Sequence, residues 1–241
     1  MSDLQRISSF IRSFYPDETG MLNDLYIDAV SRGVPVIRQD TKELLRLLLS
    51  MKKPKRILEI GTAVGFSALF MSSCCPEAEI VTMELDPARA EEAGGNFRRF
   101  TSGDPSGTPQ GNDPEKAVDE EKEDCPGRIR LLEGDASALL PQLEGSFDFF
   151  FVDAAKGQYI VYLPEVLRLA APGAVILSDN VLQDGTILES HFLVEKRDRT
   201  IHDRMREYLR ALINTPELTT SILPVGDGVA VSHVAEREQD E

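Results

Sequence analysis

The sequence predicts an α/β fold with a mostly parallel, seven-stranded sheet, a C-terminal antiparallel hairpin and helices on both faces. Short apolar segments alternate with longer segments of helical periodicity along the chain. The inner apolar segments, such as residues 147–152, lack the polar alternation of a half-exposed strand, as expected where helices cover both faces. Residues 219–232 form two strand-like segments around Gly226-Asp227-Gly228, and Asp-Gly between hydrophobic segments is a strong hairpin signal.

The predicted elements follow in order along the chain. Helical spacing is found in residues 3–14, 19–32, 41–51, 66–73, 87–100, 137–143, 159–170 and 195–212. Strands are predicted at residues 57–61, 79–85, 129–135, 147–153 and 173–180, before the hairpin. Residues 34–37 are predicted to be short and extended, and Thr41 is the expected N-cap of the helix that follows them.

Length and charge predict a single domain with two appendages. The 241 residues fit one domain, residues 1–241, with an N-terminal helical extension over about residues 1–50. Residues 101–126 hold eight acids, two lysines and almost no large hydrophobic side chains, so we expect a flexible acidic insert there. The formal net charge of -15 opposes nonspecific binding to nucleic acid.

Compartment is predicted from what the sequence lacks. Three cysteines, two of them the adjacent Cys74 and Cys75, make neither a disulfide framework nor a zinc spacing. No apolar segment has the length of a membrane helix, and the first residues have no apolar core of a secretory signal. We therefore expect a cytoplasmic protein with no membrane partner.

Acidic residues recur where the predicted strands end, and ligands of parallel sheets bind beyond those ends. Gly61 and Gly65 allow the turn after the first strand to pass close to a ligand. Glu59 would repel a pyrophosphate there but suits a cationic ligand, such as the sulfonium and amino group of S-adenosylmethionine. Glu84 is placed to accept from ribose hydroxyls, and Asp135 to meet an adenine amino group.

Each of these signals also has a purely structural explanation, because a glycine turn is often only a turn and an acid at a strand end is often only solvated. Their recurrence at four successive strand ends, with Asp153 as the last, favours an adenosine-cofactor site. The glycine pattern of a dinucleotide-binding dehydrogenase and the Lys-Ser/Thr of a P-loop are both absent, so a dehydrogenase is only a weak alternative.

A second group of polar residues predicts a metal site. Asp153 and Asp179-Asn180 end the fourth and fifth predicted strands, which would be neighbours. Their oxygen ligands suit Mg²⁺ rather than zinc. Taken alone, Asp179-Asn180 is better explained as a turn after a strand, and the presence of Asp153 across the cleft reverses that preference. Lys156 is either a solvated surface lysine or, beside a metal ligand, a general base.

Three segments carry a family resemblance. ILEIGTAVGFS (57–67), FVDAAKGQY (151–159) and ILSDNVL (176–182) resemble the S-adenosylmethionine-dependent, metal-dependent O-methyltransferases that include catechol and caffeoyl-CoA methyltransferases. VPVI, VDAAKGQY, SDNVLQDG and PVGDGVAVS most resemble the bacterial branch containing tRNA 5-hydroxyuridine methyltransferase. The resemblance covers about residues 30–100 and 127–233 and implies a Rossmann-like class I methyltransferase fold.

The resemblance also implies roles for individual residues. Lys156 matches the proposed catalytic base. Asp153 is also implied to be catalytic, and it takes part in both the metal and the cofactor site. The implied metal ligands are Asp153, Asp179 and Asn180. The implied cofactor contacts are Ile37, Glu59, Gly61, Ser67, Glu84, Asp135, Ala136 and Asp153. The family resemblance further implies a homodimer and Mg²⁺, or another divalent cation, as cofactor.

The acceptor is predicted less directly. Ala154 and Ala155 stand where catechol enzymes carry bulky aromatics, and the chain has no tryptophan, which indicates a wider mouth. The preferred acceptor is therefore wobble 5-hydroxyuridine in tRNA, whose 5-hydroxyl and 4-carbonyl form an oxygen pair. Lys196, Arg197 and Arg199 could meet RNA phosphates, although alternating charges on an ordinary amphipathic helix explain them equally well.

Two other hypotheses stay open at this point. The same chemistry on a small catechol-like diol is the first alternative. A non-catalytic adenosine-binding or regulatory module is the second, and the intact set of candidate catalytic and metal-binding residues speaks against it.

Overall fold

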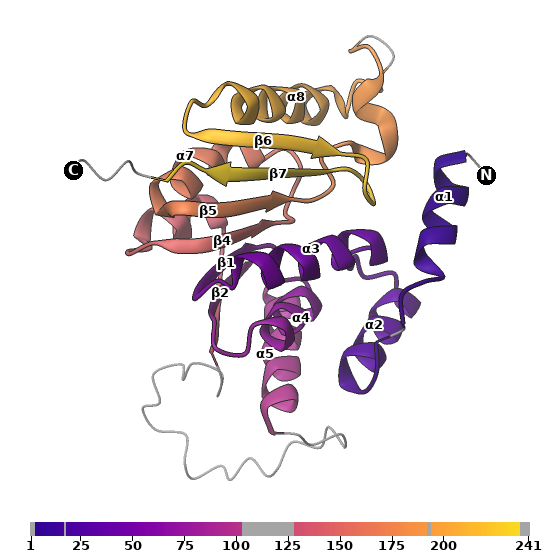
Figure 1. Ribbon diagram of the computed structural model, residues 1–241, viewed down its shortest axis with the longest axis vertical. Helices are drawn as coiled ribbons and strands as arrows, with labels where there is room; N and C mark the ends of the chain where they lie inside the picture. The colour runs from indigo at the N-terminus through magenta and orange to yellow at the C-terminus, as the bar shows by residue number, and fades with distance from the viewer. Residues whose placement is uncertain (1–2, 17, 103–127, 192–193, 237–241) are drawn as a thin grey trace.

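The computed structural model describes residues 3–16, 18–102, 128–191 and 194–236 (Figure 1). The predicted acidic insert, residues 101–126, lies almost entirely outside these ranges, so its flexibility stays a prediction.

The observed elements follow the predicted order. The helices are α1 (Asp3–Arg12), α2 (Met21–Ser31), α3 (Gln39–Lys52), α4 (Phe66–Cys74), α5 (Pro87–Ser102), α6 (Ala136–Leu139), α7 (Tyr159–Leu169) and α8 (Arg199–Asn214), with short 3-10 helices η1 (Leu140–Gln142) and η2 (Gln183–Leu188). The strands are β1 (Arg56–Ile60), β2 (Glu79–Glu84), β3 (Ile129–Glu133), β4 (Phe147–Val152), β5 (Ala170–Ser178), β6 (Leu218–Leu223) and β7 (Val229–Val234). Every predicted strand is present, and η2 is a helix that the sequence did not predict.

The strands form one seven-stranded sheet in the order β3-β2-β1-β4-β5-β7-β6. Strands β1 to β5 are parallel to one another, while β7 runs antiparallel to both β5 and β6. This arrangement confirms the predicted fold class, including the C-terminal hairpin. Strand β1 lies between β2 and β4, so chain order reverses beside it, and such a reversal opens a crevice at the carboxyl ends of the strands.

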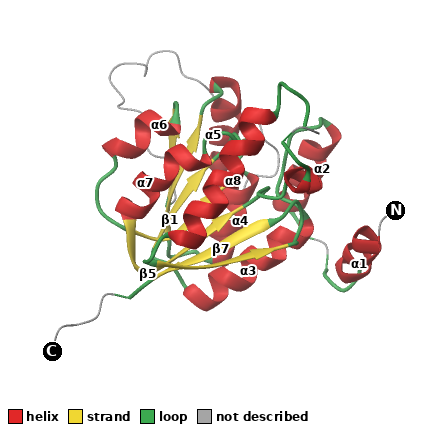
Figure 2. Ribbon diagram, turned by 90° about the horizontal axis from the view of Figure 1, so that it is seen from above, coloured by secondary structure: helices red, strands yellow, loops and turns green. Residues whose placement is uncertain are grey.

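Both faces of the sheet are covered by helices (Figure 2). In β4, Phe149 and Phe151 pack into one core with side chains of α2 to α5. Phe150 and Val152, which alternate with them, pack into the other core with side chains of α6, α7 and α8. A strand that is buried on both faces has no solvent-facing side chains, which explains why the apolar run in β4 is continuous. Burial of each phenylalanine stabilises the fold by about 1.5–3 kcal/mol.

The start of α3 differs from the prediction. Its N-cap residue is Arg38, which makes no side-chain capping hydrogen bond. The prediction of Thr41 as N-cap is therefore wrong. Thr41 lies inside the first turn, is fully buried, and donates a hydrogen bond to Asp179 Oδ1 at 3.4 Å. Its hydroxyl supports the edge of the sheet instead of the helix terminus.

The long C-terminal helix also begins later than predicted, at Arg199 instead of residue 195. The chain first makes a turn, in which the Asp198 amide donates to the Glu195 carbonyl at 2.8 Å. An ion pair between Arg197 and Glu195, 3.0 Å from nitrogen to oxygen, closes the same turn. Helical charge spacing alone does not reveal such a turn. No helix in the described part of the chain has the length and apolarity of a membrane span.

Candidate active site

A cavity of about 610 Å³ opens at the carboxyl ends of β1 to β4, at the reversal of strand order. Its volume falls within the range of roughly 300–1,000 Å³ that is usual for small-molecule sites. Nine of the residues predicted from sequence contribute to its wall. These are Ile37, Gly61, Ser67, Glu84, Asp135, Ala136, Asp153, Lys156 and Asn180. Glu59 and Asp179 are not among the lining residues and lie behind the wall.

The turn after β1 is built around two glycines with positive φ, Gly61 at 104° and Gly65 at 87°. A Cβ on Gly61 would meet the carbonyl oxygen of Asp153 at 2.0 Å, and one on Gly65 would meet the Phe97 ring at 2.5 Å. The expectation that both glycines are needed for ligand approach is thus incomplete. Their small size is already required by the protein itself, because the β1 turn packs on the backbone that follows β4 and on α5.

Glu59 is fully buried beneath this turn. Its Oε2 accepts a hydrogen bond from the Thr82 hydroxyl at 2.5 Å, while its Oε1 is buried without a hydrogen-bond partner. Burial raises the pKa of Glu59 to about 7, although the nearby hydroxyls of Ser67 and Thr82 lower it. A buried carboxylate oxygen without a donor is costly, so this atom suits a ligand that brings an N–H group.

Glu84 is the last residue of β2, and Asp135 directly precedes α6. Both carboxylates already accept hydrogen bonds from backbone amides. The Ala63 amide donates to Glu84 Oε2 at 2.8 Å, and the Asp86 amide donates to Oε1 at 2.9 Å. Asp135 is the N-cap of α6 and accepts from the Ser137 amide at 2.8 Å. Each carboxylate oxygen has a second lone pair, so these bonds orient the acids without preventing contact with ribose or adenine.

Sequence reasoning missed several residues of the wall, among them Ala63, Arg89 and Tyr162. Ala63 has a positive φ of 48°, and no residue-type signal marks an alanine for that conformation. Arg89 lies in the first turn of α5 and Tyr162 on α7, and both face a site at the strand ends. A position in the first turn of a helix that follows a strand is the signal that could have identified Arg89 and Tyr162.

The predicted metal ligands lie together at the ends of β4 and β5. The Asp153 amide donates to the Ile60 carbonyl and the Asp179 amide to the Val152 carbonyl, each at 2.9 Å, so both acids continue the sheet. The Asn180 side-chain amide donates to Asp153 Oδ1 at 2.7 Å. Asn180 has a φ of 60°, an unusual conformation that is often found at functional sites.

The two carboxylates are electrostatically strained. Burial raises the pKa of Asp179 to about 7, and the neighbouring charge of Asp153 adds to this shift. Burial also raises the pKa of Asp153, against the opposing effects of Asn180 and Lys156. The donor set consists of two carboxylates and one amide. It fits Mg²⁺, which prefers hard oxygen ligands and keeps positions for water or substrate.

Neighbouring side chains hold this pair from behind. The Tyr159 hydroxyl donates to the Asp179 carbonyl at 2.9 Å, and it lies 3.2 Å from the Val152 carbonyl. In the next layer Ser178 and Tyr208 share a hydrogen bond of 2.6 Å. Lys156 is partly buried and lines the cavity three residues after Asp153. The geometry thus brings the candidate base and most of the candidate metal ligands and cofactor contacts to one opening, with Asp179 and Glu59 behind its wall.

These features define a class of protein. A Rossmann-like sheet with a C-terminal antiparallel pair, and acids at successive strand ends around one cavity, is the architecture of a class I methyltransferase. A family model described as O-methyltransferase matches residues 17–103 and 116–234, which is most of the sequence. The chain therefore belongs to the O-methyltransferase family, and it is an S-adenosylmethionine-dependent enzyme.

Known proteins support this assignment. The chain is 34% identical to a catechol O-methyltransferase from Mycobacterium tuberculosis over 72% of its own length and 75% of that protein. It is 32% identical to a catechol O-methyltransferase from Niastella koreensis over 66% of its own length and 65% of that protein, slightly under two thirds. A methyltransferase from Podospora anserina, solved with bound S-adenosylhomocysteine, is 25% identical with a TM-score of 0.77, covering 96% of this chain and 95% of that one.

Proposed function

We propose that this O-methyltransferase uses a divalent cation, held by Asp153, Asp179 and Asn180, to methylate one of two adjacent oxygens on its acceptor. The observation that carries the proposal is that Asp153 and Asn180 line the same cavity as Glu84 and Asp135. Asp179 lies behind its wall, at the end of the neighbouring strand β5. Burial raises the pKa of both carboxylates, and the charge of Asp153 adds to the shift of Asp179, so a nearby cation would stabilise their ionised forms.

The first half of the proposed site binds the methyl donor. S-adenosylmethionine supplies the methyl group from its sulfonium. Glu59 has one unpaired buried oxygen for the amino group of this cofactor, and Glu84 and Asp135 are oriented by backbone amides for the ribose and adenine. Ile37, Ser67 and Ala136 complete the wall. Because these side chains are already fixed, binding costs little reorganisation.

The second half of the proposed site prepares the acceptor. When bound, a divalent cation would stabilise the deprotonated form of the acceptor oxygen. Lys156 takes the proton from the acceptor hydroxyl. Asp153 and Asp179 orient the acceptor side of the site, and the rigid ends of β4 and β5 hold them in line with the methyl donor. Positioning of this kind supplies much of the rate acceleration.

A small diol of the catechol type is the acceptor that we favour. Two of the three basic residues expected to meet RNA phosphates are engaged locally. Arg197 pairs with Glu195 and Asp198, and Arg199 donates to the Val194 carbonyl. The formal net charge of -15 also opposes RNA binding. Both catechol-named relatives agree with a small substrate.

Wobble 5-hydroxyuridine in tRNA is the second candidate acceptor. Ala154 and Ala155 line the cavity beside Lys156, so no bulky side chain from this turn narrows the mouth. The 5-hydroxyl and 4-carbonyl of the base offer the same adjacent oxygen pair as a catechol. The prediction of tRNA as acceptor therefore remains a prediction.

Methyl transfer from labelled S-adenosylmethionine tests both candidates. The enzyme is incubated with Mg²⁺ and, separately, with a panel of catechols and with tRNA that contains 5-hydroxyuridine. Label in catechols that is lost with EDTA supports the favoured proposal. Label in tRNA alone would overturn the small-diol acceptor and keep the chemistry, whereas labelling that persists in EDTA would overturn the metal-dependent mechanism.

We also propose that the enzyme is a homodimer, with α1 in the interface. This helix stands apart from the body in Figure 1. It is tied to α3 through polar contacts of Ser8 and Arg12 with Asp40. The helix and the turn that follows it expose apolar side chains, with Phe10 of α1 at 66% and Phe14 of the turn at 71%. Light scattering should give a dimer for the native chain and a monomer for the double variant Phe10→Asp, Phe14→Asp.

A further inference from the structure

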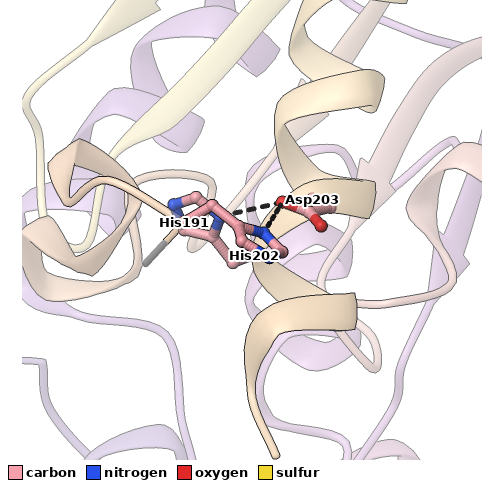
Figure 3. A group of neighbouring side chains, drawn as sticks. All are labelled: His191, His202 and Asp203. Carbon is pink, nitrogen blue, oxygen red and sulfur yellow. Dashed lines mark hydrogen bonds and ion pairs between the residues drawn. The ribbon is translucent and has the colours of Figure 1, made fainter. Parts of the chain in front are cut away.

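A second group of candidate metal ligands lies outside the cavity, where the segment after η2 meets the start of α8. It consists of His191, His202 and Asp203 (Figure 3). Two of the three histidines in the chain are therefore found in one cluster. His202 and Asp203 belong to the first turns of α8, and His191 approaches them from the preceding segment. None of these residues lines the proposed active site.

The ligand atoms are spaced as a metal ion requires. The Asp203 Oδ1 atom lies 3.0 Å from His191 Nδ1 and 3.3 Å from His202 Nδ1. One ligand atom from each of the three residues falls within 4.8 Å of the other two. Tetrahedral zinc with bonds of about 2.0–2.1 Å places its ligand atoms about 3.3 Å apart. Only small side-chain adjustments would bring all three atoms onto one ion.

The orientation of His202 points to a positive charge in the cluster. Its Nε2 lies 3.1 Å from the backbone carbonyl of Glu189, which can only accept a hydrogen bond, so Nε2 carries the proton. In a neutral ring, Nδ1 then presents a bare lone pair toward the carboxylate of Asp203. Two acceptors that face each other need a proton or a metal ion between them. Histidine ligands of metals commonly donate their other N–H to a carbonyl in this way.

The surroundings distinguish this cluster from an ordinary surface ion pair. His202 is only 2% exposed, so its ring is held in place by packing, whereas Asp203 is exposed and leaves the cluster open to solvent. An ion could enter from the solvent side and find one ligand already fixed. Two nitrogens and one carboxylate oxygen suit Zn²⁺ and its first-row neighbours, whereas Mg²⁺ prefers oxygen ligands alone.

We propose that His191, His202 and Asp203 form a second cation site that binds Zn²⁺ or a similar first-row divalent metal. The bound ion would fasten the segment around His191 to α8. This helix also contacts the turn that carries Lys156, because Arg204 donates to the carbonyl of the next residue, Gly157, at 3.2 Å. The ion thus braces the acceptor side of the cavity from outside and takes no part in the chemistry.

Cobalt binding tests the proposal, because Co²⁺ occupies such sites and absorbs visible light strongly in tetrahedral coordination. The metal-free Asp179→Asn variant is used as parent, so that the oxygen-ligand site does not contribute. Co²⁺ is titrated by absorption and by calorimetry, and Zn²⁺ is then added as competitor. His191→Ala and Asp203→Asn are the test variants, and His233→Ala is the matched control, because it removes a histidine of β7 that lies outside the cluster.

We expect one Co²⁺ per chain with a visible absorption band that Zn²⁺ abolishes. Each test variant should weaken binding about tenfold or more, and the control should leave binding unchanged. Equal affinity in parent and test variants would overturn the proposal. Absence of stoichiometric Co²⁺ binding to the parent would also overturn it and would leave a proton as the bridging charge. Both results are independent of methyl transfer, so they do not depend on the proposed function.

Discussion

The two halves of the active-site cavity differ in how their acids are hydrogen-bonded. At the ends of β1 to β3, each acid accepts a hydrogen bond that is already formed. Glu84 accepts from two backbone amides, Asp135 from one, and Glu59 from the Thr82 hydroxyl. At the ends of β4 and β5, burial raises the pKa of both Asp153 and Asp179, and the charge of Asp153 adds to the shift of Asp179.

The difference shows how one sheet edge can serve two ligands. The cofactor half is organised before any ligand binds, and among the buried acid oxygens that the structure describes there, Glu59 Oε1 lacks a donor. In the metal half, the hydrogen-bond donors are too few to stabilise both ionised carboxylates. A bound cation would therefore stabilise their charged forms. Asn180 and Thr41 offset part of this deficit by donating to Asp153 and Asp179. The comparison predicts that changes in one half should leave ligand binding in the other half nearly intact.

The largest effect is expected for Lys156→Met. Loss of the proposed base should lower kcat by about 10²–10⁴-fold, because proton transfer by a positioned side chain contributes that much. Affinity for S-adenosylmethionine should stay within about threefold, since Lys156 belongs to the acceptor half. Steady-state kinetics and calorimetry measure the two quantities. Lys196→Met is the control for loss of an exposed positive charge, and equal kcat in both variants would exclude Lys156 as the base.

A smaller effect is expected in the pH dependence of stability. Folding raises the pKa of Glu59 from the ordinary value of 4.5 to about 7, so the folded state holds a proton that the unfolded state has released. The contribution of Glu59 to the free energy of unfolding therefore falls as pH rises through this window. Between pH 5 and pH 8, the free energy of unfolding of the cofactor-free native protein should fall by about 2–3 kcal/mol relative to that of Glu59→Gln.

Urea unfolding of both proteins at each pH measures this difference. Comparison with the variant cancels the contributions of other acids that titrate in the same range. If the difference in free energy of unfolding between the two proteins does not change with pH, burial does not raise the pKa of Glu59 as described. A saturating concentration of S-adenosylmethionine should reduce the slope, because its amino group would favour the charged form of Glu59.

The junction of the two halves can be broken at Gly61. The Gly61→Ala change adds a Cβ 2.0 Å from the Asp153 carbonyl oxygen at a φ of 104°. The overpacked turn should lower the free energy of unfolding by about 1–3 kcal/mol. It should also weaken the binding of both S-adenosylmethionine and Mg²⁺. Gly95→Ala is the matched control, because nothing lies within 4 Å of its Cβ in α5. Normal binding of both ligands by Gly61→Ala would show that the halves are not joined there.

The smallest effect is expected for Glu84→Gln. The substituted amide keeps the size of the side chain, but it places an N–H group against one of the two backbone amides that the carboxylate accepts from. We expect about a tenfold loss of S-adenosylmethionine affinity by calorimetry. Binding of Mg²⁺ should not change. Glu91→Gln, on the exposed side of α5, provides the control, and unaltered cofactor affinity in Glu84→Gln would remove Glu84 from the proposed contacts.

The sequence was sufficient to predict the sheet and the strand-end clusters. Residues 147–152 have no polar alternation, which is typical of a strand buried on both faces, and Asp153 follows directly. In a parallel sheet the ends of neighbouring strands must meet, so the closeness of Asp153 and Asp179 followed once β4 and β5 were predicted to be adjacent. The turn glycines were also identified, although the reason for Gly61 lies in the backbone of Asp153.

Other features depend on tertiary contacts that no local pattern encodes. Thr41 has the residue type of an N-cap, yet it is buried against Asp179 because the turn before β7 packs there. Glu59 was predicted as a cofactor contact, but its depth below the wall was not. The cluster of His191, His202 and Asp203 joins two segments whose approach is set by the turn before α8. Histidine spacing alone gives no reason to expect it.

The central claim is that the acids at the ends of β4 and β5 form a metal site that methyl transfer requires, separate from the cofactor half. The most direct measurement compares the native protein with Asp179→Ala. Binding of S-adenosylmethionine and Mg²⁺ is followed by calorimetry, and methyl transfer is assayed on the same samples. We predict that cofactor affinity stays within about threefold while Mg²⁺ binding and methyl transfer are lost. Full methyl transfer by Asp179→Ala in the presence of EDTA would contradict the account.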